Sequence, residues 1–99
     1  MDEMDIVIAQ RIVLGAIRIV FEMNDMDLDF SLHENLDRTL HDIGIVSSEH
    51  RQILRSAVFQ KAREEGYEIE VSRIPIGPTE TVFNVVSALP GHSTKGNTL

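Results

Sequence analysis

Two adjacent serines, Ser47 and Ser48, are the side chains best placed for chemistry in this sequence. They follow the apolar stretch Ile43 to Val46 and precede a long amphipathic segment, so they lie where a helix should begin. A serine there usually caps the helix, because its hydroxyl accepts a hydrogen bond from a backbone N–H of the first turn. The alternative is that one of these hydroxyls is a reactive site, and the rest of the chain decides between the two uses.

An acidic cluster has the spacing that opens a calcium-binding loop, but it fails at two later positions. Asp25, Asp27 and Asp29 alternate with other residues, as the first three ligands of such a loop do. The required glycine is replaced by Phe30, and the required bidentate glutamate is replaced by Leu36. The cluster therefore predicts a solvated acidic loop without calcium.

The histidines do not form a recognisable catalytic or metal-binding set. His33, His41 and His50 are too scattered for a zinc site, and the chain contains no cysteine to complete one. His50 shares a helix start with Ser47, but no aspartate is placed to complete a catalytic triad. No nucleophile–base pair remains, so we do not expect an enzyme.

Composition indicates one small acidic domain. The 99 residues are 42% hydrophobic and 25% charged, and the formal net charge of −7 disfavours binding to nucleic acid. An acidic N-terminus is unlike a signal peptide, and Gln10, Arg11 and Arg18 interrupt the one apolar run that approaches the length of a membrane span. We expect a cytoplasmic monomer without a membrane span.

Hydrophobic spacing predicts a mainly helical chain with one domain over residues 1–91. Apolar residues recur at intervals of three and four over residues 2–21, 48–65 and 82–89. A long acidic connection over residues 24–42 follows the first helix, with a short helical turn expected at 33–40. Gly66 should end the second helix, a short strand-like stretch follows it, and residues 92–99 should form a disordered tail.

The order of these features resembles that of the acyl carrier protein family. Asp42 to Ser48 is similar to the family signature Asp-Leu-Gly-x-Asp-Ser-Leu, with Val46 in place of the aspartate and Ser48 in place of the leucine. Gly66 to Glu70 resembles the aromatic-then-acidic exit from the second helix of the family. Thr81 to Leu89 resembles its closing helix. The resemblance covers about residues 4 to 90 and depends on the order of these parts.

The resemblance implies an all-α fold, an acyl-carrier-like four-helix bundle of three longer helices and one short helix. It also implies that Ser47 carries a covalent 4′-phosphopantetheine arm, added from coenzyme A by a phosphopantetheinyl transferase. The arm would present acyl groups or related thioesters to acyl-transferring or synthase enzymes of fatty-acid, polyketide or specialised lipid synthesis. A phosphate attached at Ser47 would lie at the favourable end of a helix dipole.

Two other interpretations remain open. In the first, the chain is a helical protein–protein interaction module without an arm, and Ser47 is only a cap. In the second, the fold is α+β, and residues 68–76 and 80–89 pair as a hairpin because of their β-branched content.

Overall fold

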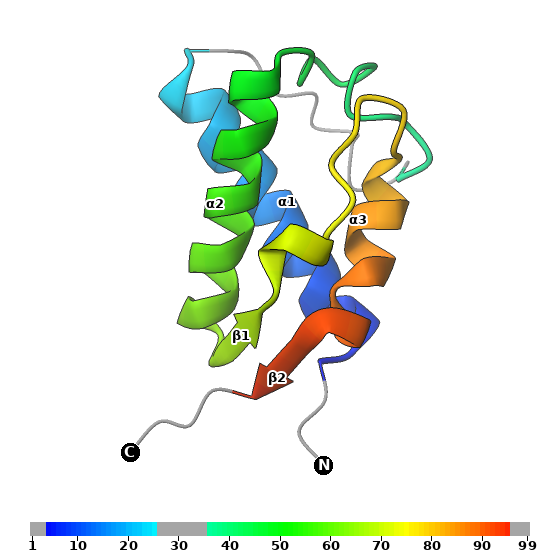
Figure 1. Cartoon of the computed structure of the whole chain (residues 1–99). Coiled ribbons are helices and arrows are strands. Elements are labelled where there is room, and N and C mark those ends of the chain that lie inside the picture. Colours follow the sequence, from blue (N-terminus) through cyan, green and yellow to red (C-terminus); the bar gives the residue numbers. More distant parts are fainter. Residues whose placement is uncertain (1–3, 26–35, 96–99) are drawn as a thin grey trace.

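The structure is a computed structural model that describes residues 4–25 and 36–95. Within these residues the chain forms three α-helices that pack side by side, with a two-stranded sheet at one end (Figure 1). The elements are α1 (Ile6–Met23), α2 (Ser48–Glu64), β1 (Tyr67–Ile69), the 3-10 turn η2 (Val71–Arg73), α3 (Val82–Ala88), the 3-10 turn η3 (Pro90–His92) and β2 (Ser93–Lys95). The chain is therefore mainly helical, as predicted. Besides the three α-helices, the described residues form only two short 3-10 turns, so the four-helix arrangement is not confirmed.

Helix α1 begins at an aspartate cap and buries one broad face. The Oδ1 atom of Asp5 accepts a hydrogen bond of 2.8 Å from the backbone N–H of Ile8. The buried residues follow helical spacing: Ala9, Ile12, Val13, Ala16, Ile17, Val20 and Phe21. Ile6 was expected on this face but is 46% exposed, because it lies in the first turn beyond the packed surface. No helix in the described ranges is long and apolar enough to cross a membrane.

Helix α2 runs antiparallel to α1. Arg11 of α1 pairs with Glu65, just after the end of α2, at an N–O distance of 2.6 Å. At the opposite end, the end of α1 lies near the start of α2 (Figure 1), where Met23 and Glu49 line the same groove. Gly66 ends the helix with φ 90°, the left-handed conformation that was predicted for it.

Helix α3 shows that the hairpin interpretation is wrong. Residues 80–89 do not form a strand, because Thr81 caps a helix there and its Oγ1 accepts a hydrogen bond of 3.0 Å from the N–H of Asn84. Val82, Val85 and Val86 are all buried, at the spacing of a helix face. Burial of this face outweighs the strand preference of valine.

The region expected to be a disordered tail contains a strand. Ser93 and Lys95 of β2 pair antiparallel with Ile69 and Tyr67 of β1, and the N–H of Glu70 extends the contact to the carbonyl of His92 at 3.0 Å. The ordered domain thus continues past the expected boundary at residue 91. The pairing satisfies backbone groups of β1, whose side chains alternate between buried and exposed.

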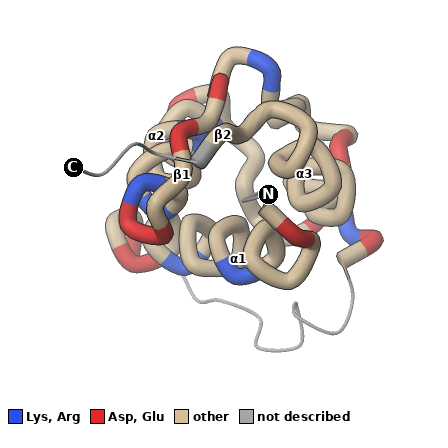
Figure 2. The backbone as a smooth tube through the Cα atoms, turned by 90° about the horizontal axis from the view of Figure 1, so that it is seen from below, with Lys and Arg blue, Asp and Glu red and all other residues tan. Residues whose placement is uncertain are grey.

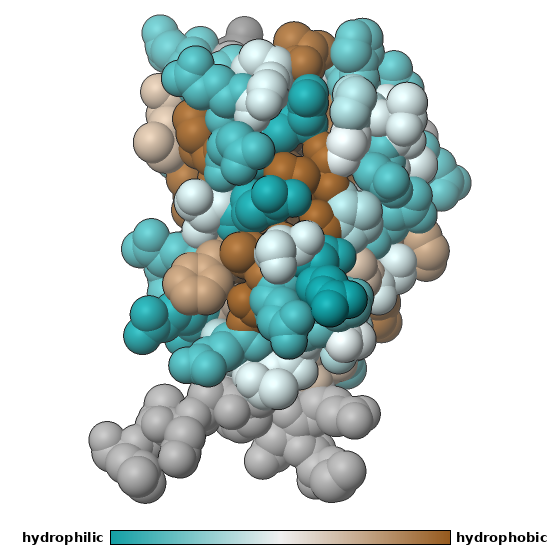
Figure 3. Space-filling view, in the orientation of Figure 1, coloured by the Kyte–Doolittle hydropathy of each residue, from teal (hydrophilic) through white to brown (hydrophobic). Residues whose placement is uncertain are grey.

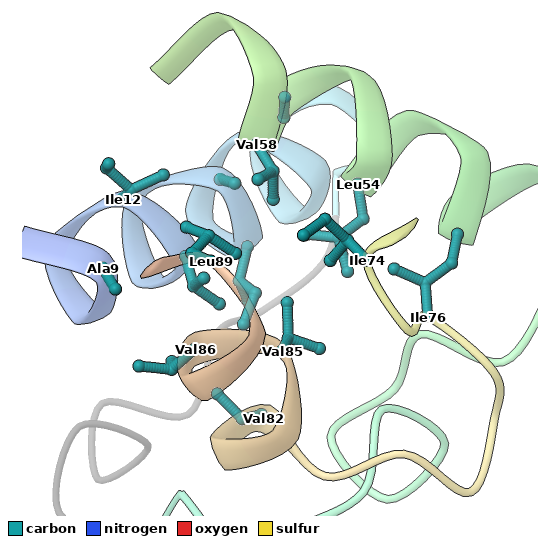
Figure 4. Close-up of a cluster of buried hydrophobic side chains, with 14 of the residues drawn as sticks. Ala9, Ile12, Leu54, Val58, Ile74, Ile76, Val82, Val85, Val86 and Leu89 are labelled. Atoms are coloured by element: carbon teal, nitrogen blue, oxygen red, sulfur yellow. The ribbon is translucent and has the colours of Figure 1, made fainter. Parts of the chain in front are cut away.

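The core joins all three helices. Ile12 of α1, Leu54 of α2 and Leu89 after α3 point into the same cluster (Figure 4) and are almost completely buried. Ile74 and Ile76, on the segment between η2 and α3, close the cluster. Seen along the bundle, charged positions lie around the outside (Figure 2), and no polar or charged residue in the described part is buried. Hydrophobic burial is therefore the main stabilising contribution.

Candidate functional site

A short anchored turn positions Ser47 at the start of α2. Leu40 and Ile45 are both fully buried, and the N–H of Ile45 donates to the carbonyl of Leu40 at 2.9 Å. Between them Gly44 adopts φ 109°, and its N–H donates to the carbonyl of His41 at 3.1 Å. Because a left-handed residue without a side chain closes this turn, the chain reverses within a few residues and delivers Ser47 to the surface.

The same turn is fixed to the beginning of α3. The N–H of Leu40 donates to the carbonyl of Glu80 at 2.9 Å, and Thr39 forms an isolated antiparallel bridge with Thr81. The N–H of Val82 donates to the carbonyl of Arg38 at 3.0 Å. The N-terminal ends of α2 and α3 are therefore connected through one hydrogen-bonded segment, which limits how far Ser47 can move relative to the core.

Ser47, rather than Ser48, is the cap of α2. Its backbone is extended, with φ −90° and ψ 152°, and its Oγ accepts a hydrogen bond of 3.0 Å from the N–H of His50. Ser47 is half-buried, whereas Ser48 is a helical residue with an exposed side chain. The sequence left the choice between the two serines open, and the structure assigns the cap to the first.

The immediate surroundings of Ser47 include one cation. Arg51 lies one turn after Ser47, and its Nη1 donates to the carbonyl of Val46 at 2.9 Å. Val46 is 51% exposed, so the residue just before Ser47 presents an apolar side chain to solvent. First-turn N–H groups, the helix dipole and the Arg51 guanidinium all favour a negative group at this end of α2.

An apolar groove lies between α1 and α2 at the same end of the bundle. It has a volume of about 540 Å³. Its apolar walls are Ile19 and Met23 from α1 and Ile53 and Ala57 from α2, and polar side chains of α2 complete the lining: Glu49, Gln52, Ser56 and Gln60. This volume is within the usual range of small-ligand sites.

The groove was not predicted from the sequence. Met23, which lines the groove, is 67% exposed. Hydrophobic spacing identifies the buried faces of both helices, but it does not show that a groove remains between them beside Met23. The distance between two packed helices depends on side chains that are far apart in the chain.

The possible catalytic and metal sites that the sequence analysis considered can be compared with the structure only within the described ranges. The Nδ1 atom of His50 has no hydrogen-bond partner there, and no set of three His, Asp or Glu side chains is placed to hold a metal ion. The calcium-like cluster falls mostly outside the described residues, as does His33. Of the helical turn expected at 33–40, residues 36–40 are described, and they form non-helical turns with an isolated bridge at Thr39.

Among the described residues, one side chain has a clearly shifted pKa, and it lies at the opposite end of the bundle. The side-chain hydrogen bond from Arg11 to Glu65 and the negative charge of that carboxylate raise the pKa of Arg11 above its usual value. The Arg11 side chain is exposed, so this interaction does not create a reactive group. It marks the contact between the start of α1 and the end of α2.

Comparisons with known proteins identify no relative. No family model matches the chain, and neither a curated protein nor a solved structure matches it. Function is therefore argued from the sequence pattern and from the site alone.

Proposed function

We propose that this chain is a small carrier domain with its attachment point at Ser47. The observation that carries the proposal is the position of the Ser47 hydroxyl, which lies at the first turn of α2 after an anchored glycine turn. A phosphopantetheine attached there has its phosphate beside first-turn N–H groups, with Arg51 close by as a counter-charge. The exposed residues Ser48 and Glu49 leave the site open to a transferase.

The proposed fold is a reduced form of the carrier bundle. Its three helices correspond in order to the three longer helices of the acyl carrier family, and η2 takes the place of the short one. The domain has no catalytic activity of its own. It would serve a phosphopantetheinyl transferase and acyl-transferring or synthase enzymes of fatty-acid, polyketide or specialised lipid synthesis, as a monomer in the cytoplasm.

The groove between α1 and α2 supports an apolar cargo on the arm. Glu49 lies two residues from Ser47 and also lines the groove, so the attachment point and the apolar walls are at one end of the molecule. Transfer of an acyl chain from water onto Ile53 and Ala57 is favourable by about 0.8 kcal/mol for each buried CH₂ group.

The experiment uses the absence of cysteine from the chain. Before modification the protein has no thiol, so after incubation with coenzyme A and a broad-specificity transferase any protein-bound thiol belongs to the arm. We expect one thiol per chain by titration after removal of free coenzyme A. Ser47→Asn keeps a good cap but lacks the hydroxyl, so it should give none. Ser48→Ala should still give one.

A second candidate is the interaction module without an arm, and the hydrogen bond of the Ser47 hydroxyl to the N–H of His50 favours it. Capping of α2 is by itself a sufficient reason for a serine at this position. This alternative predicts no thiol on the wild-type chain, although the control carrier in the same reaction is modified. It also predicts that Ser47→Asn preserves every function of the protein.

A further inference from the structure

The charge along α2 is opposite in sign to that of the whole chain. The helix carries four basic side chains, Arg51, Arg55, Lys61 and Arg63. It carries only two acidic ones, Glu49 and Glu64, whereas the formal charge of the chain is −7. The overall composition is acidic, so it does not account for the positive charge of α2.

Three of the arginines and one aromatic residue follow a single line along α2. Arg51, Arg55, Phe59 and Arg63 are each four residues apart, so neighbours in this set contact one another on the helix surface. Phe59 is 36% exposed, and the guanidinium carbon of Arg63 lies 5.8 Å from the centre of its ring. We call these four residues the arginine face.

The charges of the arginine face are not neutralised within the described ranges. Arg51 donates to the carbonyl of Val46 at 2.9 Å, and Arg55 donates to the carbonyl of Ile74 at 3.5 Å. Both acceptors are uncharged. None of the ion pairs between described residues includes Arg51, Arg55 or Arg63. The Nε atom of Arg55 is buried without a hydrogen-bond partner among the described residues, so the donors that the face offers to a partner come from its other guanidinium nitrogens.

Lys61 shows the contrasting arrangement on the same helix. It pairs with Glu64 at 3.5 Å, and its side chain lies over α1, where a Cβ atom on Gly15 would meet the Lys61 Cε at 3.5 Å. Lys61 therefore belongs to the contact between the two helices. The arginine face is directed elsewhere, toward η2 and the solvent.

We infer that the arginine face docks onto an acidic surface of another protein. Guanidinium groups form paired hydrogen bonds with carboxylates, and arginine with exposed aromatic side chains is enriched at protein interfaces. Apolar surface also runs down the middle of the molecule, between α2 and the segment leading to α3, with hydrophilic residues on both sides (Figure 3). The inference goes beyond the carrier proposal, because it does not require an arm on Ser47.

The experiment measures binding of a labelled, helix-forming synthetic peptide that carries glutamate at every fourth position. A second peptide has lysine at the same positions. We expect the acidic peptide to bind at physiological salt despite the net negative charge of the protein, because screening over about 8 Å leaves mainly local charges effective. The lysine peptide should not bind.

Matched variants locate the binding site. Arg55→Gln with Arg63→Gln should raise the Kd for the acidic peptide by about tenfold, since two charge pairs are lost. The control, Arg11→Gln with Arg18→Gln, removes the same charge from α1 and should change the Kd by less than about twofold. Circular dichroism checks that both double variants keep the helical content of the wild type.

Three results would overturn the inference. Equal loss of affinity in both double variants would mean that only net charge matters. Binding to phosphatidylserine vesicles but not to the acidic peptide would indicate a membrane surface. Sedimentation equilibrium could instead show a dimer of the wild-type chain that becomes a monomer in the Arg55→Gln, Arg63→Gln variant. This result would indicate that the partner is a second copy of the chain. Ser47→Asn should leave peptide affinity unchanged, so failure of the carrier proposal is distinguishable from failure of this one.

Discussion

Ser47 and Thr81 perform the same structural task at the starts of α2 and α3. Each side-chain oxygen accepts a hydrogen bond of 3.0 Å from the backbone N–H three residues later. For α2 the sequence predicted a cap but offered two adjacent serines for it. The choice depends on where the preceding segment enters the helix, and this segment is fixed by contacts between Leu40 and Glu80 that are distant in sequence.

Loss of the Ser47 cap should weaken the fold without destroying it. We expect Ser47→Ala to lower the free energy of unfolding by about 0.5–2 kcal/mol, because the N–H of His50 loses its acceptor. Ser48→Ala is the control, since this side chain is exposed and forms no cap. Urea unfolding followed by circular dichroism measures both. Equal stability of the two variants would contradict the assignment of the cap.

Replacement of Gly44 by alanine should destabilise the fold more than replacement of Gly91. At φ 109° a Cβ atom is strained, so we expect Gly44→Ala to lower the free energy of unfolding by about 1 kcal/mol or more. Gly91→Ala is the matched control, because no atom lies within 4 Å of the added Cβ and φ there is not in the left-handed range. Thermal unfolding of the pair tests the prediction, and a similar loss at both positions would contradict it.

Among the elements, α3 was predicted from the sequence and β2 was not. The helix over residues 82–88 was predicted from its cap and its apolar spacing, despite three valines that favour strands. The strand Ser93–Lys95 was not predicted, because short polar residues carry no period-two pattern. Its pairing depends on the unsatisfied edge of β1 and not on its own side chains.

The sheet gives a prediction at the scale of elements. Deletion of residues 93–99 should lower the free energy of unfolding by about 1 kcal/mol or more, since several backbone hydrogen bonds to β1 are lost. Deletion of residues 96–99 alone retains both strands and serves as the control. The two truncated chains are compared by thermal unfolding. If both deletions have the same effect, the strand pairing contributes no stability.

At the scale of the whole molecule, one core connects the helices. Leu54 is fully buried in the middle of α2 and lies in the same cluster as Ile12 and Leu89. We expect Leu54→Ala to lower the free energy of unfolding by about 2–5 kcal/mol, because it leaves a cavity. Val7→Ala should change it by about 0.5 kcal/mol at most, since Val7 is 67% exposed. Chemical unfolding of both variants provides the comparison.

The helical class, the three helices and the cap at the start of α2 followed from local patterns. The groove and the antiparallel order of α1 and α2 required the folded chain, because they arise from contacts such as Arg11 with Glu65. The carrier proposal remains a proposal about Ser47. The packing of the bundle is equally compatible with a module that carries no arm.

The most direct test of the carrier proposal is the intact mass of the chain after co-expression with a broad-specificity phosphopantetheinyl transferase. We predict a mass increase of one phosphopantetheine group, located on the peptide that contains Ser47 and absent from the Ser47→Asn variant. The wild-type chain should fold equally well with and without the group. An unmodified mass for the folded wild-type chain, when a control carrier in the same cells is fully modified, would contradict the proposal.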